Sequence, residues 1–322
     1  MKLKLPATLV GTLLACSLLS AERPARAYVR SVTSKGMATA WSKSRIDLKL
    51  YVGDPPPNMG TDGLSRAVHA AAATWSTPAV SCAGISLVVE DVKMPIAPAE
   101  YDSQNLLGFR RDQWRKMPCT PSDKELCSPY SALAIAITTV TSNTRTGEIL
   151  DADMEINEVQ NIFADVLLDG AKLVGTAHVQ DLQNTVTHEL GHLIGLDHNC
   201  YGSIPATGIP LDGRGEAAPS CVGAGPEITD ATMFGTAGER ETKKRDLAPD
   251  DLQAVCDVYP VGYQGLPVLD DANDKTGGCM VANRPGSTAP APAGLAGLAL
   301  LLGGALLRTR GGRRFRARRP RP

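Results

Sequence analysis

The middle of the chain alternates between two apolar patterns. Alternation with β-branched and aromatic residues predicts strands at 45–52, 85–92, 105–114, 131–142 and 147–157. Apolar residues recurring every three or four positions predict helices at 64–76 and 181–195 and a last helix within 248–260, capped at or near Asp250. The elements interleave without a strict strand–helix–strand repeat, so we expect an α+β domain with a mixed, twisted sheet and about three helices.

The first 27 residues form a pattern of their own. Two lysines precede an apolar run from Leu5 to Leu19, and Ala25-Arg26-Ala27 follows. This order is typical of a secretory signal peptide, which we expect to be cleaved after Ala27. The alternatives are a buried N-terminal helix and lipidation at Cys16, although apolar residues continue beyond that cysteine.

The other end, residues 279–322, also differs from the middle. Cys279 is followed by a Pro/Ser/Thr-rich spacer, the apolar stretch 293–307 and eight arginines. The stretch is shorter than the roughly 20 residues that span a bilayer, and the arginines favour the cytoplasmic side. The order resembles a cleaved sorting tail, most closely the MYXO-CTERM type, with a permanent anchor as the alternative. We therefore expect a domain at 28–265 and a linker at 266–278.

Setting the ends aside changes the charge of the domain. They carry +3 (residues 1–27) and +9 (residues 280–322), so the middle carries −13 although the chain totals −1. Nucleic-acid binding requires a basic face, which excludes DNA and RNA as expected partners. The negative net charge of this domain fits a soluble extracellular protein and makes Ca²⁺ an additional candidate ligand.

Six cysteines remain in this domain: Cys82, Cys119, Cys127, Cys200, Cys221 and Cys256. An even number in an exported domain predicts up to three disulfides, with about 15 possible pairings. Proximity in the sequence favours Cys119–Cys127 and Cys200–Cys221, which leaves Cys82–Cys256. The spacing contains no CxxC-like pair of metal ligands.

The segment THELGHLIGLDH holds three of the five histidines of the chain. On a helix, His188 and His192 lie on one face, one turn apart. Glu189 is adjacent, and Gly195 allows a sharp turn that returns His198 to the same ion. Three imidazoles with an open fourth position are the ligand set of a catalytic zinc. The alternative, a core helix that happens to carry histidines, leaves the glutamate and the glycine unexplained.

This HExxHxxGxxH pattern, with a methionine downstream, resembles the metzincin zinc metallopeptidases, and most closely their matrixin branch. The resemblance runs from about residue 44 to 260 and implies a zincin-like fold whose active-site helix carries the motif. It implies that Met233 in DATMFGTAG forms an apolar floor beneath the zinc. It also implies that strand 147–157 borders the cleft and pairs with extended substrate, and that Asp250 and Asp251 tie the last helix to the Met233 region.

The sequence departs from the matrixin pattern at several places. Asn199 replaces the usual serine, and the segment between His198 and Met233 is long. Of the histidines of the family's structural zinc site only His178 remains, so we expect it to have a surface or helix-start role and expect one catalytic zinc. There is no room for a propeptide between Ala27 and the first strand, and no cysteine-switch motif.

The resemblance implies a zinc-dependent endopeptidase acting on extracellular proteins or peptides. Zinc would lower the pKa of its water toward about 7, and Glu189 would act as the general base. We expect an exported monomer that contacts the membrane only through its tail. Two other function classes remain open: a non-catalytic surface adhesion protein on the same fold, and a zinc amidase that acts on the cell wall.

Overall fold

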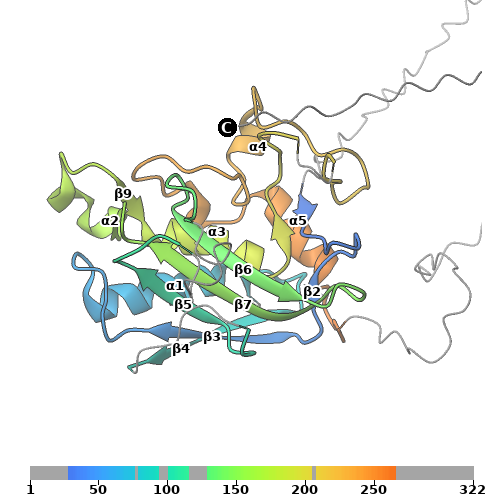
Figure 1. The fold of residues 1–322 in the computed structure, drawn as a ribbon, viewed down its shortest axis with the longest axis horizontal. Coiled ribbons are helices and arrows are strands. Elements are labelled where there is room, and N and C mark those ends of the chain that lie inside the picture. Colours follow the sequence, from blue (N-terminus) through green and yellow to red (C-terminus); the bar gives the residue numbers. More distant parts are fainter. Residues whose placement is uncertain (1–27, 77–78, 94–100, 116–128, 205–207, 266–322) are drawn as a thin grey trace, which may run out of the picture. The chain divides into compact units, whose positions relative to one another are not determined.

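The five predicted strands, together with one short strand that the pattern did not predict, form a six-stranded sheet in the computed structural model (Figure 1). The structure describes residues 28–76, 79–93, 101–115, 129–204 and 208–265. The main path of the sheet runs β2-β7-β5-β3-β4, and β6 pairs with β7. All pairings are parallel except that of β6. The strands are β2 (Ala40–Trp41), β3 (Arg45–Tyr51), β4 (Ser86–Val92), β5 (Leu106–Arg110), β6 (Ala136–Ser142) and β7 (Glu148–Asn157).

Two strands are shorter than predicted. β5 ends at Arg110 because its partner residue, Asn157, is the last of β7. β6 begins at Ala136, since a turn in which Ala134 N donates to Ser131 O precedes it. Strand ends are therefore set by the partner strand and by adjoining turns, which the alternating pattern does not reveal.

The strand expected to border the cleft lies inside the sheet. β7 pairs with β2 and β5 as well as with β6. Both of its faces are buried: Ala152 and Met154 are 0% exposed, and Asp151 and Asp153 are 2% exposed. The expectation for 147–157 is therefore wrong. Among the described strands, β6 is the antiparallel edge strand next to β7.

Three long helices stabilise this sheet: α1 (Gly60–Trp75), α3 (Leu182–Leu193) and α5 (Pro249–Val258). α1 begins four residues before the predicted Leu64 and buries an apolar stripe that includes Val68, Ala71 and Trp75. The Trp75 Nε1 atom donates to Thr187 O at 2.7 Å, which fixes α1 against α3. The core joins these helices to the apolar face of the sheet.

Besides β2, further short elements that the pattern did not predict complete the described part. They are β1 (Val29–Arg30), β8 (Ile162–Ala164), β9 (Val179–Asp181), β10 (Leu196–Asp197), α2 (Val166–Asp169), α4 (Pro226–Thr229) and the 3₁₀ turns η1 (Gly170–Leu173) and η2 (Lys243–Arg245). β1 pairs with β10, and β8 with β9. Such short segments contain too few residues to show a periodicity.

The two aspartates at the start of α5 have different partners. The N-cap is Ala248, so Asp250 lies within the first turn and does not cap the helix. Asp250 Oδ1 accepts from Tyr28 N at 3.0 Å. Asp251 accepts from Thr232 N at 2.7 Å and from Met233 N at 3.1 Å. Asp251 therefore ties α5 directly to the Met233 loop, which we define as residues 231–237.

Two of the predicted disulfides are present, Cys200–Cys221 and Cys82–Cys256. Cys119 and Cys127 lie outside the described residues. Disulfides form and persist in oxidising compartments, which fits an exported protein.

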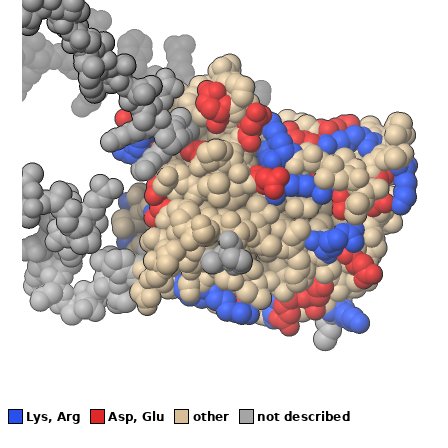
Figure 2. All heavy atoms as spheres, turned by 180° about the vertical axis from the view of Figure 1, so that it is seen from behind, with Lys and Arg blue, Asp and Glu red and all other residues tan. Residues whose placement is uncertain are grey.

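The described residues fall within one compact unit that ends at Leu269. Within this part of the chain no helix is long and apolar enough to cross a bilayer. The predicted signal peptide, linker and tail lie outside it. Figure 2 shows acidic and basic side chains interspersed around the rim of one face, without a large basic patch.

Candidate functional site

Helix α3 positions the first two histidines. Its N-cap, Asp181, accepts from Asn184 N at 2.8 Å, and Arg245 bonds to the same carboxylate through Nε at 2.8 Å. The helix then carries His188 and His192 one turn apart, with ring centroids 4.9 Å from each other. The 3.6-residue period of a capped helix therefore gives the expected common face.

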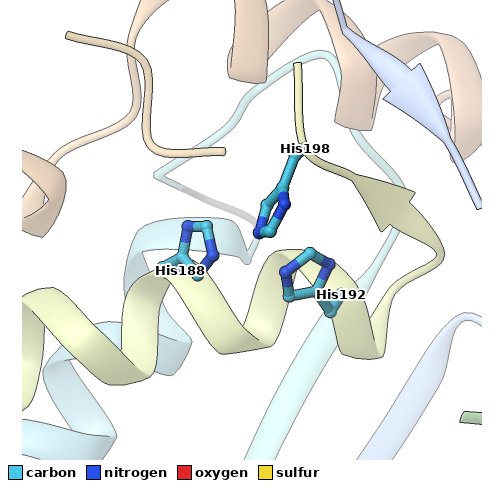
Figure 3. Close-up of side chains that lie close together, drawn as sticks. All are labelled: His188, His192 and His198. Carbon is cyan, nitrogen blue, oxygen red and sulfur yellow. The ribbon is translucent and has the colours of Figure 1, made fainter. Parts of the chain in front are cut away.

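The third histidine reaches the same place through a glycine turn. Gly195 adopts φ +90°, and its N–H donates to His192 O at 2.9 Å. A Cβ at Gly195 would lie 2.5 Å from Thr39 O, so only glycine fits. Strand β10 follows this turn, and His198 comes directly after it. One nitrogen from each ring lies within 4.8 Å of the others, so the three histidines could hold a metal ion (Figure 3).

Backbone carbonyls orient two of the rings. His188 Nδ1 lies 2.6 Å from Thr232 O, and His192 Nδ1 lies 2.9 Å from Leu196 O. A carbonyl oxygen can only accept a hydrogen bond, so each Nδ1 carries the proton and each Nε2 presents a lone pair. Burial lowers the pKa of His188 well below its usual value and the pKa of His198 to about 4. These two rings are therefore neutral, as ligands must be.

Glu189 lies beside the three histidines and is not part of the ligand group. Its Oε2 accepts from Thr138 Oγ1 at 2.7 Å, and the same hydroxyl lies 3.2 Å from Glu189 O. Burial raises the pKa of the Glu189 carboxyl, and the neighbouring His192 and the Thr138 hydrogen bond oppose this shift. The carboxylate is thus held in place by edge strand β6.

Met233 packs under the helix turn between His188 and His192. The residue is 1% exposed. A Cβ on Gly191 would lie 2.1 Å from Met233 Sδ and 3.2 Å from the Trp75 ring, so the space of the missing side chain is filled by these two residues. Met233 O also accepts from Asn199 N at 3.1 Å, which links the Met233 loop to the residue after His198.

A cavity of about 570 Å³ opens over the three histidines. One wall is β6 with the residues before it, and the other is α3 with the Met233 loop. The lining residues with polar or charged side chains are Ser31, Thr138, Asn184, Thr185, His188, Glu189, His192, His198, Thr236 and Lys244. The three histidines and Glu189 therefore line a cavity that is open to solvent.

The structure brings together the five residues expected at the metal centre: His188, Glu189, His192, His198 and Met233. His178 lies elsewhere, on the surface at the start of β9, where its ring is 71% exposed and its Nδ1 lies 3.4 Å from Glu239. Sequence reasoning missed Thr138 and Lys244. Neither carried a signal, because a threonine in a strand and a lysine in a charged run (Lys243–Arg245) are ordinary.

No family model and no curated protein matches this chain. Among solved structures, one similar chain belongs to the "GM1 bound form of the ECX AB5 holotoxin", with 14% sequence identity and a TM-score of 0.39. The match covers 75% of this chain and 94% of that chain. A likeness this weak does not assign a fold or a function.

Proposed function

We propose that this chain is a zinc-dependent endopeptidase of the metzincin type. The observation that carries the proposal is the convergence of His188, His192 and His198 in an open cavity beside a carboxylate that is not among the ligands. Three imidazole ligands with an open position are typical of catalytic zinc sites, whereas structural sites use four protein ligands.

The donor set fits zinc and no harder cation. Calcium and magnesium prefer carboxylate and carbonyl oxygen, and the three groups here are nitrogen donors. The carbonyls of Thr232 and Leu196 hold two of the rings in the tautomer that leaves Nε2 free. When bound, zinc would acidify a water molecule and polarise the substrate carbonyl.

Glu189 is the group that moves protons. Its raised pKa makes the carboxylate a better base than an exposed glutamate. Held by Thr138 on the cavity wall, it takes a proton from the attacking water and delivers it to the leaving amine. An adhesion module that only binds a metal has no use for a buried carboxylate in this position.

The edge strand supports a peptide as the substrate. β6 has a paired side, toward β7, and a side that lines the cavity through Ala136, Ile137 and Thr138. An extended chain can add to such an edge through main-chain hydrogen bonds. This assigns the substrate-pairing role to β6 in place of the strand expected from the resemblance.

Metal analysis combined with cleavage of a peptide library tests the proposal. We expect one zinc per chain and chelator-sensitive cleavage within peptides. Glu189→Ala should keep the zinc and lose nearly all hydrolysis, and His198→Ala should lose zinc. Full activity in Glu189→Ala, or no cleavage of any peptide by the zinc-loaded protein, would overturn the assignment, and hydrolysis of cell-wall amides alone would indicate an amidase.

A further inference from the structure

A buried lysine forms part of the cavity wall. Lys244, in η2, has a side chain that is only 2% exposed. It is the only lysine or arginine among the residues that line the cavity, and Glu189 is the only carboxylate. The positive charge of Lys244 lowers the pKa of His188, of His198 and of the Glu189 carboxyl.

The ammonium group is fixed in position by the Met233 loop. Nζ donates to Phe234 O at 2.6 Å and to Thr236 O at 2.7 Å. The backbone N of Lys244 donates to Asn184 Oδ1 at 2.8 Å, which ties this residue to α3. The side chain therefore cannot turn away from the cavity without breaking two hydrogen bonds.

Two hydrogen bonds leave one N–H of the ammonium unused, since the group has three. The nearest carboxylate oxygen, Glu241 Oε1, is 4.0 Å away, which is beyond hydrogen-bonding distance. Glu241 is also shared with Lys243, at 3.8 Å. Among the described residues no other acceptor is within hydrogen-bonding distance of Nζ, so the third N–H has no partner in the protein.

The opposite wall of the cavity is apolar and consists of Leu133, Ala134, Ile135, Ala136 and Ile137. A charge that faces an apolar wall is poorly screened. It therefore attracts a carboxylate and repels a cation more strongly than it would in water. A glutamate side chain matches both features, because its methylenes can contact the apolar wall while its carboxylate accepts from Nζ.

We propose that Lys244 makes the cleft select substrates with an acidic side chain, glutamate above all, next to the scissile bond. This inference rests on the proposed endopeptidase function and adds the substrate class. Peptides with a basic residue at the same position are excluded, because their cation would be buried beside Lys244.

The test is a set of peptides identical except for one residue, which is Glu, Gln, Leu or Lys, placed in turn on either side of the cleaved bond. For the zinc-loaded protein we expect kcat/KM for Glu to exceed that for Gln at least about tenfold at one of these positions, as for a hydrogen bond to a charged group. The Lys peptide should be the poorest substrate.

Two variants of Lys244 test whether this residue causes the preference for glutamate. Lys244→Met should bring the Glu/Gln ratio close to one, and Lys244→Arg should keep a preference for Glu. Lys243→Met is the matched control, because Lys243 bonds to Thr229 O and Asp230 outside the cavity and its loss changes the net charge equally.

The outcomes separate the two proposals. If no peptide is cleaved, the endopeptidase function fails. If peptides are cleaved with equal rates for Glu, Gln and Lys, the function stands and the role of Lys244 is refuted. The role of Lys244 is also refuted if the Glu/Gln ratio falls as much in Lys243→Met as in Lys244→Met. If Lys244→Met does not fold, the peptide series measured on the unaltered protein still tests the preference for glutamate.

Discussion

Thr138 Oγ1 donates to Glu189 Oε2 at 2.7 Å and joins the edge strand β6 to the helix that carries the histidines. The two residues are 51 positions apart in the chain. The bond orients the carboxylate on the wall against which a substrate would lie. It makes Thr138 a positioning residue for the proposed reaction.

Replacing Thr138 by valine removes this donor while keeping the shape of the side chain. We expect kcat to fall by roughly 10- to 100-fold, as is usual for groups that orient catalytic residues, with little change in KM or zinc content. Thr138→Ser should keep most of the activity. Thr141→Val, on the opposite face of β6, serves as the control, and wild-type kcat in Thr138→Val would contradict the role.

Gly195→Ala tests the turn that returns His198 to the site. The backbone has φ +90° there, and a Cβ would meet Thr39 O at 2.5 Å. We expect a loss of more than about 1 kcal/mol in the free energy of unfolding and weaker zinc binding, because His198 is displaced. Gly202→Ala is the matched change, since no atom lies within 4 Å of its Cβ position. Equal zinc affinity in both variants would show that the turn does not position His198.

The preference for glutamate should depend on pH. Burial, with a smaller contribution from Lys243, lowers the pKa of Lys244 to about 8, and Glu241, Glu189 and Asp251 oppose the shift. The ammonium is charged below this pKa and loses its charge above it. The Glu/Gln ratio of kcat/KM should therefore be high near neutral pH and decline as the pH rises through about 8. Dividing by kcat/KM for the Gln peptide corrects for every other titrating group. A Glu/Gln ratio that stays constant up to about pH 10 would contradict the prediction.

The two disulfides should differ in their contribution to stability. Cys82–Cys256 joins residues 174 positions apart, and Cys200–Cys221 joins residues 21 apart. Loop-closure entropy gives about 5 kcal/mol for the first and about 3 kcal/mol for the second. Denaturant unfolding of the two paired Cys→Ser variants measures both values. The reverse order would mean that native-state contacts of the 200–221 loop outweigh chain entropy.

The sequence alone located the centre of the candidate site because that part of the site is local. Helical period brings His188 and His192 together, and a left-handed glycine lets His198 return within six residues. The long helices and the main strands could also be predicted, because the spacing of apolar residues in an amphipathic element shows which face is buried. Strand ends and two-residue strands could not be predicted in this way, because they depend on the partner strand.

Tertiary structure decided which strands pair and which further residues reach the site from distant segments. The placement of β7 inside the sheet depends on which strands pair with it, and an alternating pattern is the same for an edge strand and for an interior one with buried acids. Thr138, Lys244 and the Thr232 carbonyl reach the site from segments 44 to 56 positions away from His188 and Glu189. Their contacts follow from packing of the whole chain, since no local propensity encodes a partner at that separation.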